Sequence, residues 1–516
     1  MVSNSSTAAR TRSPGGAAWS KIQIQRLAHT QSRLDEEQGV RMAKYLYRFR
    51  KFSDLKGDKE KNRESELLGR YIFFASPDKL NDPLEGHREI VWRGDHIVWT
   101  NLFAHYFLCL TLRHVDCSTY INIEDVPFSV LHSYLDKPPE RSKKIKELCT
   151  TFLNNKNVIQ HLSLLSFKER EIKRDELILH LSVLHNYAMH IIAQHLAKVG
   201  MVIGGVGLHA ATPEELLETS TNILDFFSTL SPDALLTASH NLQDSLLAPV
   251  QENALKLNYA IWSENKNQTW MDLHINFPER YVTSLKSLCS NSWYTACFME
   301  SCSNSAIWGS YGSEHKGACL KFKVDETKQG YSLDFLIPSA LDDKSWRKET
   351  LDFVKVEYDG ISPDLDFFRS LGAIPEPKLI SDWLMRNGSK SSCFDDIYSD
   401  VEKWRSEYHS HIQKSITSKT EEWSEEVEQR LLLQSFLFDY SPTENRKLRY
   451  NFKSLDSIIF GVNMPLTQKL ELIEMVTKLC AESGRPEFIF HQAYFTSSKK
   501  IGYREIYKVS MTSTAK

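Results

Sequence analysis

Residues 308–315 combine side chains that could hold and process a ligand. Trp308 and Tyr311 are aromatic, and His315 is an acid–base residue type. Apolar and polar residues then alternate over 317–324, a period of two that predicts a half-buried strand. The two aromatic residues are three apart, so their rings would form one wall of a helical turn at the start of that strand. The alternative is a helix–strand junction with packed aromatic rings and a surface histidine.

A second group of ionisable residues consists of Glu426, Glu428 and Arg430. In a strand these side chains share one face, because successive side chains point to opposite sides. Arg430 could then hold one carboxylate ionised, while the other accepts a proton or binds a ribose hydroxyl. In a helix they would spread around the surface as a solvated charge run, and the segment contains good helix formers. The residues alone leave both structures open.

The tripeptide Asn81-Asp82-Pro83 is a strong turn signal. Asparagine and aspartate bond to their own backbone in turns, and proline fixes the next dihedral angle. Glu85 follows this turn without being required by it. The segment is therefore either a simple turn or a loop that presents carboxylates and an amide to a ligand.

Four segments follow one another along the chain. They are an aromatic-basic strand at 45–50, a Ser-Pro…Asn-Asp-Pro-x-Glu loop at 76–85, a Trp-x-x-Tyr…His-x-Gly-x-Cys-x-x-Phe block at 308–322 and a Trp-x-x-Glu-x-Glu-x-Arg block at 423–430. This order resembles the bacterial family known as domain of unknown function 2971, over about residues 44–94 and 292–508. Leu80 and Leu84 depart from it, because phenylalanine is usual there. The resemblance favours a strand for the paired glutamates, which the family places before an apolar run.

The order of these segments is also similar to that of the ADP-ribosyltransferases. The similarity implies a transferase that uses a nucleotide such as NAD as its substrate, with no other cofactor assigned. Glu428 or Glu426 would stabilise an oxocarbenium-like ribose, with His315 as a further acid–base candidate. The remaining residues expected to bind substrate are Arg50, Tyr47, Asn81, Asp82, Glu85, Trp308, Tyr311 and Arg430. Arg50 would hold the pyrophosphate, and an aromatic ring would pack on nicotinamide.

Two other functions stay open at this point. The first is a non-catalytic binding or regulatory protein, in a stress response or in phage defence, with a helical segment as its partner surface. The second is a metal-dependent hydrolase or nuclease using Asp82, Glu85, His315 and the paired glutamates, since carboxylates and histidine can bind hard cations. No spacing among these residues is typical of a metal site, and we assign none.

Composition narrows the classes of partner. The chain has 516 residues with 41% hydrophobic and 25% charged residues, which is ordinary for a globular protein. Its net charge of −3 gives no general attraction for nucleic acid or anionic membrane. Nine cysteines without a Cys-x-x-Cys pair are typical of reduced thiols in a cytoplasmic protein. No apolar run reaches the ~18 residues of a membrane-spanning helix.

Periodicity and breaks predict an α+β fold with a mixed sheet core, flanking helices and a large helical insertion. We expect residues 1–33 to be a disordered tail, 34–94 the first part of a core domain, 95–290 the helical insertion and 291–516 the second part of the core. Histidines recur every five residues from His180 to His195. That spacing turns each by ~140° around a helix, so they cannot form a metal array on one face.

Overall fold

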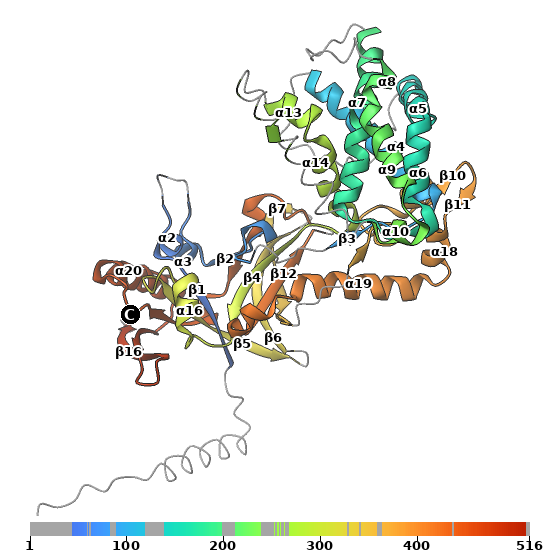
Figure 1. Ribbon diagram of the computed structural model, residues 1–516. Coiled ribbons are helices and arrows are strands. Elements are labelled where there is room, and N and C mark those ends of the chain that lie inside the picture. The colour runs from blue at the N-terminus through green and yellow to red at the C-terminus, as the bar shows by residue number, and fades with distance from the viewer. Residues whose placement is uncertain are drawn as a thin grey trace, which may run out of the picture. The chain divides into compact units, whose positions relative to one another are not determined.

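The fold is given by a computed structural model that describes residues 44–511 with gaps (Figure 1). The gaps are 59, 61–62, 83–88, 119–138, 199–211, 239–251, 253–254, 257–258, 260–262, 264–267, 328–329, 340–341, 359–363 and 436–437. The predicted tail 1–33 and Glu85 therefore lie outside the described residues. Helices and a large, mainly antiparallel set of strands confirm the predicted α+β class. Within the described part of the chain, no helix is both long and apolar enough to cross a membrane.

The chain divides into two compact units. Unit 1 comprises 1–68, 300–334 and 451–516, and unit 2 comprises 69–299 and 335–450. These boundaries differ from the predicted divisions after residues 94 and 290, because each unit takes strands from both predicted parts of the core. The two units are described separately below.

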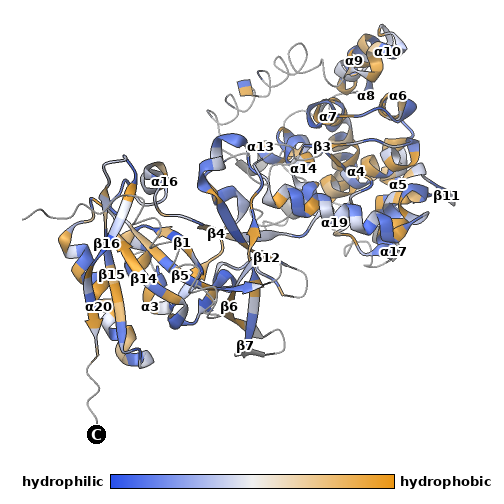
Figure 2. Cartoon of the chain, turned by 90° about the horizontal axis from the view of Figure 1, so that it is seen from below, coloured by the Kyte–Doolittle hydropathy of each residue, from blue (hydrophilic) through white to orange (hydrophobic). Residues whose placement is uncertain are grey.

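Unit 1 is built on strands in the order β16-β15-β14-β5-β1. The strands are β1 (Lys44–Arg50), β5 (Ala318–Thr327), β14 (Leu455–Phe460), β15 (Glu487–Phe495) and β16 (Ile501–Ser510). β1 and β5 are antiparallel, with Arg50 opposite Ala318. Figure 2 shows hydrophobic residues along β14 and β15, which run parallel. Parallel neighbours need a crossover, and α20 (Leu466–Ser483) supplies it.

Sequence signals explain the ends of α20. Pro465 precedes its first residue, and Gly484 follows its last with a left-handed φ of 63°. Proline is tolerated at a helix start, and glycine adopts the left-handed conformation that ends many helices. Two further short helices of this unit matter below: α2 (Phe52–Lys56) and α16 (Ser305–Ser310).

Unit 2 contains a smaller set of strands in the order β4-β12-β8. They are β4 (Trp293–Met299), β12 (Glu428–Gln434) and β8 (Val354–Lys355). β4 and β12 are antiparallel, with Trp293 opposite Gln434 and Met299 opposite Glu428. Nearby strands are β2 (Tyr71–Phe73) paired with β13 (Lys447–Tyr450), and β6 (Gly330–Ser339) paired with β7 (Asp342–Asp352).

Helices make up most of the described residues between 96 and 289 (Figure 1). They are α4 (His96–Ser118), α5 (Pro139–Leu153), α6 (Lys156–Leu165), α7 (Arg174–Lys198), α8 (Pro213–Leu216), α9 (Glu218–Ser228), α10 (Pro232–Leu236), α13 (Gln268–His274), α14 (Phe277–Ser284) and α15 (Lys286–Cys289). Thr212 and Glu215 form a capping box ahead of α8, which confirms the helix start predicted at Thr212-Pro213. One apolar core joins these helices to residues 365–397. We call these helices and residues 365–397 the helical part of unit 2.

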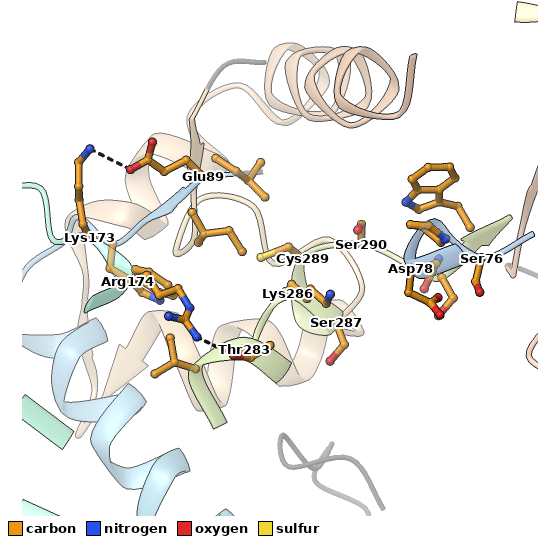
Figure 3. Close-up of a pocket in the computed structure, with 18 of the residues that line it drawn as sticks. Ser76, Asp78, Glu89, Lys173, Arg174, Thr283, Lys286, Ser287, Cys289 and Ser290 are labelled. Atoms are coloured by element: carbon orange, nitrogen blue, oxygen red, sulfur yellow. Dashed lines mark hydrogen bonds and ion pairs between the residues drawn. The ribbon is translucent and has the colours of Figure 1, made fainter. Parts of the chain in front are cut away.

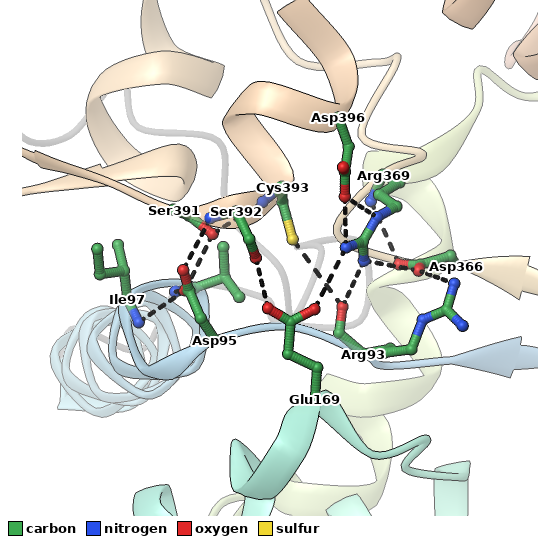
Figure 4. A network of polar contacts seen from close by, with 11 residues as sticks. Arg93, Asp95, Ile97, Glu169, Asp366, Arg369, Ser391, Ser392, Cys393 and Asp396 are labelled. Atoms are coloured by element: carbon green, nitrogen blue, oxygen red, sulfur yellow. Dashed lines mark hydrogen bonds and ion pairs between the residues drawn. The ribbon is translucent and has the colours of Figure 1, made fainter. Parts of the chain in front are cut away.

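Polar contacts tie residues 365–397 to the helices (Figure 4). The Asp95 carboxylate accepts hydrogen bonds from the backbone N–H of Ile97 (3.0 Å) and of Ser392 (2.8 Å). It therefore caps α4 and the start of α18 (Ser392–Tyr398) together. Arg369 donates to Asp396 at 2.8 Å and to Asp366 at 2.9 Å. A loop residue thus links α18 to β9 (Leu365–Asp366).

The sequence also predicts a helical region over about 363–418, with a break at Pro375 and Pro377, and the structure interrupts this region further. It contains α17 (Glu376–Lys378), a wide helical turn at Leu379–Leu384, a hairpin of β10 (Met385–Arg386) and β11 (Ser389–Lys390), and then α18 and α19 (Val401–Thr417). Asn387 and Gly388 both have positive φ at the tip of the hairpin. An Asn-Gly pair is the strongest short hairpin signal, and the helix prediction for that stretch was wrong because it missed this pair.

Candidate functional site

Trp308 is a core residue of unit 1. Its side chain is fully buried, and its ring meets Phe49 edge-on at 4.9 Å between centroids. Its indole N–H donates to the Cys302 carbonyl at 2.8 Å. Tyr311, which ends α16, is only half-buried. Trp308 therefore packs in the core with its indole N–H hydrogen-bonded, whereas Tyr311 is partly exposed. The two rings do not form the aromatic wall that the sequence predicts.

His315 closes an unusual stretch of backbone. Ser313, Glu314 and His315 all have left-handed φ, between 51° and 65°. Such residues cost ~1–3 kcal/mol each unless their surroundings hold them. The Asn463 N–H bonds to the His315 carbonyl at 3.0 Å, which helps to fix the turn. The imidazole lies 6.1 Å from the Phe495 ring, and its Nδ1 is buried with no partner among the described residues.

Arg50 and Tyr47 also belong to unit 1, on β1. Arg50 donates from Nε to Glu66 at 2.8 Å and lies 3.3 Å from Asp54. A pyrophosphate at Arg50 would compete with both carboxylates. The Tyr47 hydroxyl lies 3.4 Å from that of Tyr503, and burial, followed by this hydrogen bond, raises the pKa of Tyr47.

The paired glutamates lie in unit 2 and meet at a lysine. The prediction of a strand through Trp423–Arg430 was wrong for its first half, which is a 3-10 helix from Glu421 to Glu426. Val427 then adopts a left-handed φ of 44°, and β12 begins at Glu428. The two carboxylates nevertheless converge, because Lys419 Nζ donates to each at 2.8 Å.

Arg430 completes this cluster of buried charges, which we call the Glu428 cluster. Arg430 Nε donates to Glu428 Oε1 at 2.8 Å, and both side chains are fully buried. Burial opposes ionisation of Glu428, but the charges of Arg430 and Lys419 outweigh it and lower its pKa to about 2. Two cations neutralise two carboxylates, so the hydrogen-bonding capacity of Glu428 is already used within the protein.

The other predicted residues of unit 2 lie on the loop after residue 76. Asn81 is exposed, and Asp82 is buried. The structure thus places Arg50, Tyr47, Trp308, Tyr311 and His315 in unit 1, and Asn81, Asp82, Glu426, Glu428 and Arg430 in unit 2. Of these predicted residues, Glu426, Glu428 and Arg430 meet in one cluster with Lys419. A single site formed by both sets stays a prediction.

Histidines of α7 point to separate partners, as the spacing predicted. His180 contacts His161, His185 contacts Tyr106, and His190 contacts Gln194. Among the residues with described coordinates, no group of three or more histidine, cysteine, aspartate or glutamate side chains is arranged to hold a metal ion.

The sequence did not reveal a cavity of about 800 Å³ in unit 2, which we call the unit 2 pocket (Figure 3). Its lining comes from five stretches: 76–78, 89–92, 173–175, 282–294 and Leu365. Two elements not yet described contribute, the 3-10 helix η1 (Pro77–Lys79) and β3 (Ile90–Val91). The signals that could have found it are the Lys173-Arg174 doublet before a helix and the polar run Ser290-Asn291-Ser292 before a strand.

Two of the cations that line the unit 2 pocket already have partners. Lys173 Nζ lies 2.8 Å from Glu89, and this hydrogen bond raises the lysine pKa. Arg174 Nη2 contacts Glu279 at 2.9 Å and Thr283 Oγ1 at 3.1 Å. These groups are substantially exposed, so the ion pairs are worth about 1 kcal/mol at most. An incoming anion could displace such contacts at little cost.

Lys286 and Asp78 differ from that pattern. Both side chains are exposed and both line the pocket. Neither makes an ion pair with any residue in the described ranges. Trp293 and Tyr294, at the start of β4, line the pocket as well, and both are largely buried. Counting the described residues alone, the pocket therefore offers one lysine and one carboxylate that make no ion pair, beside two largely buried aromatic side chains.

In comparisons with known proteins, no family model, no curated protein and no solved structure matches the chain.

Proposed function

We propose that this protein binds a small anionic ligand of about nucleotide size in the unit 2 pocket. The observation that carries the proposal is Lys286, which makes no ion pair among the described residues, on a cavity that Lys173 and Arg174 also line. The lining carboxylates Glu89 and Asp175 are ion-pair partners of Lys173 and Arg174, respectively. A volume of about 800 Å³ lies within the range of ~300–1,000 Å³ that is usual for sites of small molecules.

The anionic group of the ligand would sit at Lys286 and Arg174. Arg174 contacts Thr283, and Lys286 follows Thr283 by three residues. Leu285 between α14 and α15 keeps helical backbone angles, so residues three apart remain on one side. A phosphate or carboxylate there would accept charge-assisted hydrogen bonds from both cations, and arginine can bind such groups through two parallel bonds.

The rest of the unit 2 pocket is large enough for a ligand bigger than a single ion. Trp293 and Tyr294 contribute to the lining, although Trp293 packs with Ile412 and Ile416 and the Tyr294 ring lies under Arg446. Ser287, Ser290 and Asn291 add polar groups to the lining. Planar rings pack favourably on aromatic side chains, and each such contact adds ~0.5–1.5 kcal/mol beyond the area buried. These features support a ligand with a planar ring as well as an anionic group.

Binding is better supported at this pocket than catalysis by the paired glutamates. The register of β4 and β12 places Glu428 opposite Met299, six residues along the strand from Trp293. Six residues of a strand span ~20 Å, so the Glu428 cluster lies outside the pocket. ADP-ribosyl transfer and membership of the family named above stay predictions from the order of the sequence segments.

Calorimetric titration of the full chain with NAD, ADP-ribose, purine nucleotides and inorganic pyrophosphate tests the proposal. We expect at least one nucleotide to bind, and Lys286→Met to weaken it at least tenfold, because a charge-assisted hydrogen bond is worth ~1.5–3 kcal/mol. Lys403→Met, at an exposed lysine of α19 outside the pocket, is the matched control and should bind as the unmodified protein does. Equal affinity of the Lys286 variant, or no binding by any compound, would refute the proposal.

A further inference from the structure

The unit 2 pocket has two chemically different ends. Figure 3 shows Lys173 and Arg174 at one side, Ser76 and Asp78 at the opposite side, and Lys286 and Ser287 between them. The first end therefore carries Lys173 and Arg174 together with the carboxylates of Glu89 and Asp175. Lys286, between the ends, makes no ion pair among the described residues, and the far end presents the Asp78 carboxylate. A ligand that fits both ends carries an anionic group and, some distance away, hydrogen-bond donors.

Asp78 is held in place by the backbone around it. It lies in η1, which follows Ser76 and begins with Pro77. Ala75, the residue before Ser76, exchanges two backbone hydrogen bonds with Thr295 of β4, at 2.8 and 2.9 Å. This bridge fixes η1 beside the start of β4, where Trp293 lies. η1 is thus held beside β4 by the fold, and the Asp78 carboxylate makes no ion pair within the described residues.

We infer that the unit 2 pocket selects a guanine nucleotide, with its phosphate at Lys286 and Arg174 and the edge of its base at Asp78. This inference rests on the proposed function. An ionised carboxylate only accepts hydrogen bonds, and its two oxygens match two parallel N–H donors. Guanine offers such a pair at N1 and at its 2-amino group.

The other common bases fit this end of the pocket less well. Adenine offers one amino group beside a ring nitrogen that is itself an acceptor, so its second contact with a carboxylate is repulsive. Hypoxanthine keeps the N1 donor but lacks the 2-amino group. A matched pair of hydrogen bonds to a base discriminates by ~1–3 kcal/mol, which corresponds to about 5- to 150-fold in affinity.

Competition between nucleoside monophosphates tests this selection. We expect the full chain to bind GMP at least about tenfold more tightly than IMP or AMP. Asp78→Asn should reverse the preference towards xanthosine monophosphate, because the new amide can donate to its 2-oxo group and still accept from N1–H. Asp78 is exposed, so this change should not disturb folding. Asp233→Asn, at another exposed aspartate of unit 2, is the control and should keep the preference for GMP.

The possible failures are distinguishable. If all monophosphates bind equally, with an affinity that falls in Lys286→Met but not in Asp78→Asn, the base selection is refuted and the anion site stands. If the Asp78 variant keeps the preference for GMP, Asp78 does not read the base. If no nucleotide binds, the selection and the proposed function fail together.

Discussion

Lowering the pH from 7.5 to 5 should destabilise the helical part of unit 2, by about 2 kcal/mol through His185 alone. His161 and His185 are fully buried there, and burial holds the pKa of each well below its ordinary value, for His185 at about 3. His185 binds no proton in the folded state at pH 5, whereas the same residue in the unfolded chain does below about 6.5, and the pKa of His161 shifts in the same direction. Stability is therefore complete above that pH and is lost as the pH falls towards the folded-state pKa.

A continuous chain of hydrogen bonds explains why His161 must stay neutral. Glu176 has a pKa of about 2 and is ionised, so His180 Nε2, 3.4 Å away, donates to it. His180 Nδ1 must then accept from His161 Nδ1, at 2.6 Å. His161 Nε2 accepts in turn from the hydroxyl of Ser220, at 2.9 Å. A further proton on either ring removes an acceptor that a buried donor needs.

Urea unfolding followed by circular dichroism at several pH values between 7.5 and 5 measures this effect. The free energy of unfolding should fall with a slope that corresponds to the uptake of at least about one proton, at His185. His411→Gln removes an exposed histidine of α19 and should leave that slope unchanged. A free energy that stays level over this range would show that the buried histidines are charged in the folded protein.

Glu428→Gln should lower the free energy of unfolding of unit 2 by about 3–5 kcal/mol. The substitution keeps the shape of the side chain but removes its charge. Lys419 would then keep Glu426 as its carboxylate partner, and buried Arg430 would lose the carboxylate of Glu428. Removing one member of a buried ion pair is costly, because the remaining charge has been taken out of water without compensation.

Chemical denaturation of the variant beside Glu425→Gln tests this role. Glu425 is exposed and three residues away, so its loss should change stability by less than about 0.5 kcal/mol. Unchanged stability of the Glu428 variant would contradict a structural role. If Glu428→Gln kept its stability but lost an NAD-dependent activity, the catalytic role that the sequence predicts for Glu428 would be favoured instead.

Local signals predicted much of the fold. The sequence predicts a short apolar strand at 457–461, an amphipathic helix at 466–480 and a further strand at 503–509, which correspond to β14, α20 and β16. Each of these signals acts between residues that are close in the sequence, so periodicity and helix ends are sufficient to find them. The helices between 96 and 289 were found for the same reason.

The chemistry depended on contacts that periodicity does not encode. Lys419 meets Glu426 and Glu428 only because Val427 adopts a left-handed conformation, which is rare for a β-branched residue. Trp308 looked like a ligand-binding residue, but its burial against Phe49 depends on β1, more than 250 positions earlier. The unit 2 pocket joins five separate stretches, and such long-range assembly leaves only weak local traces such as a Lys-Arg doublet.

A crystal structure of the full chain soaked with GMP tests the central claim most directly. We expect the phosphate of GMP within about 3 Å of Lys286 Nζ, with the guanine base beside Asp78. A nucleotide bound elsewhere, with the unit 2 pocket still empty under saturating GMP, would contradict it.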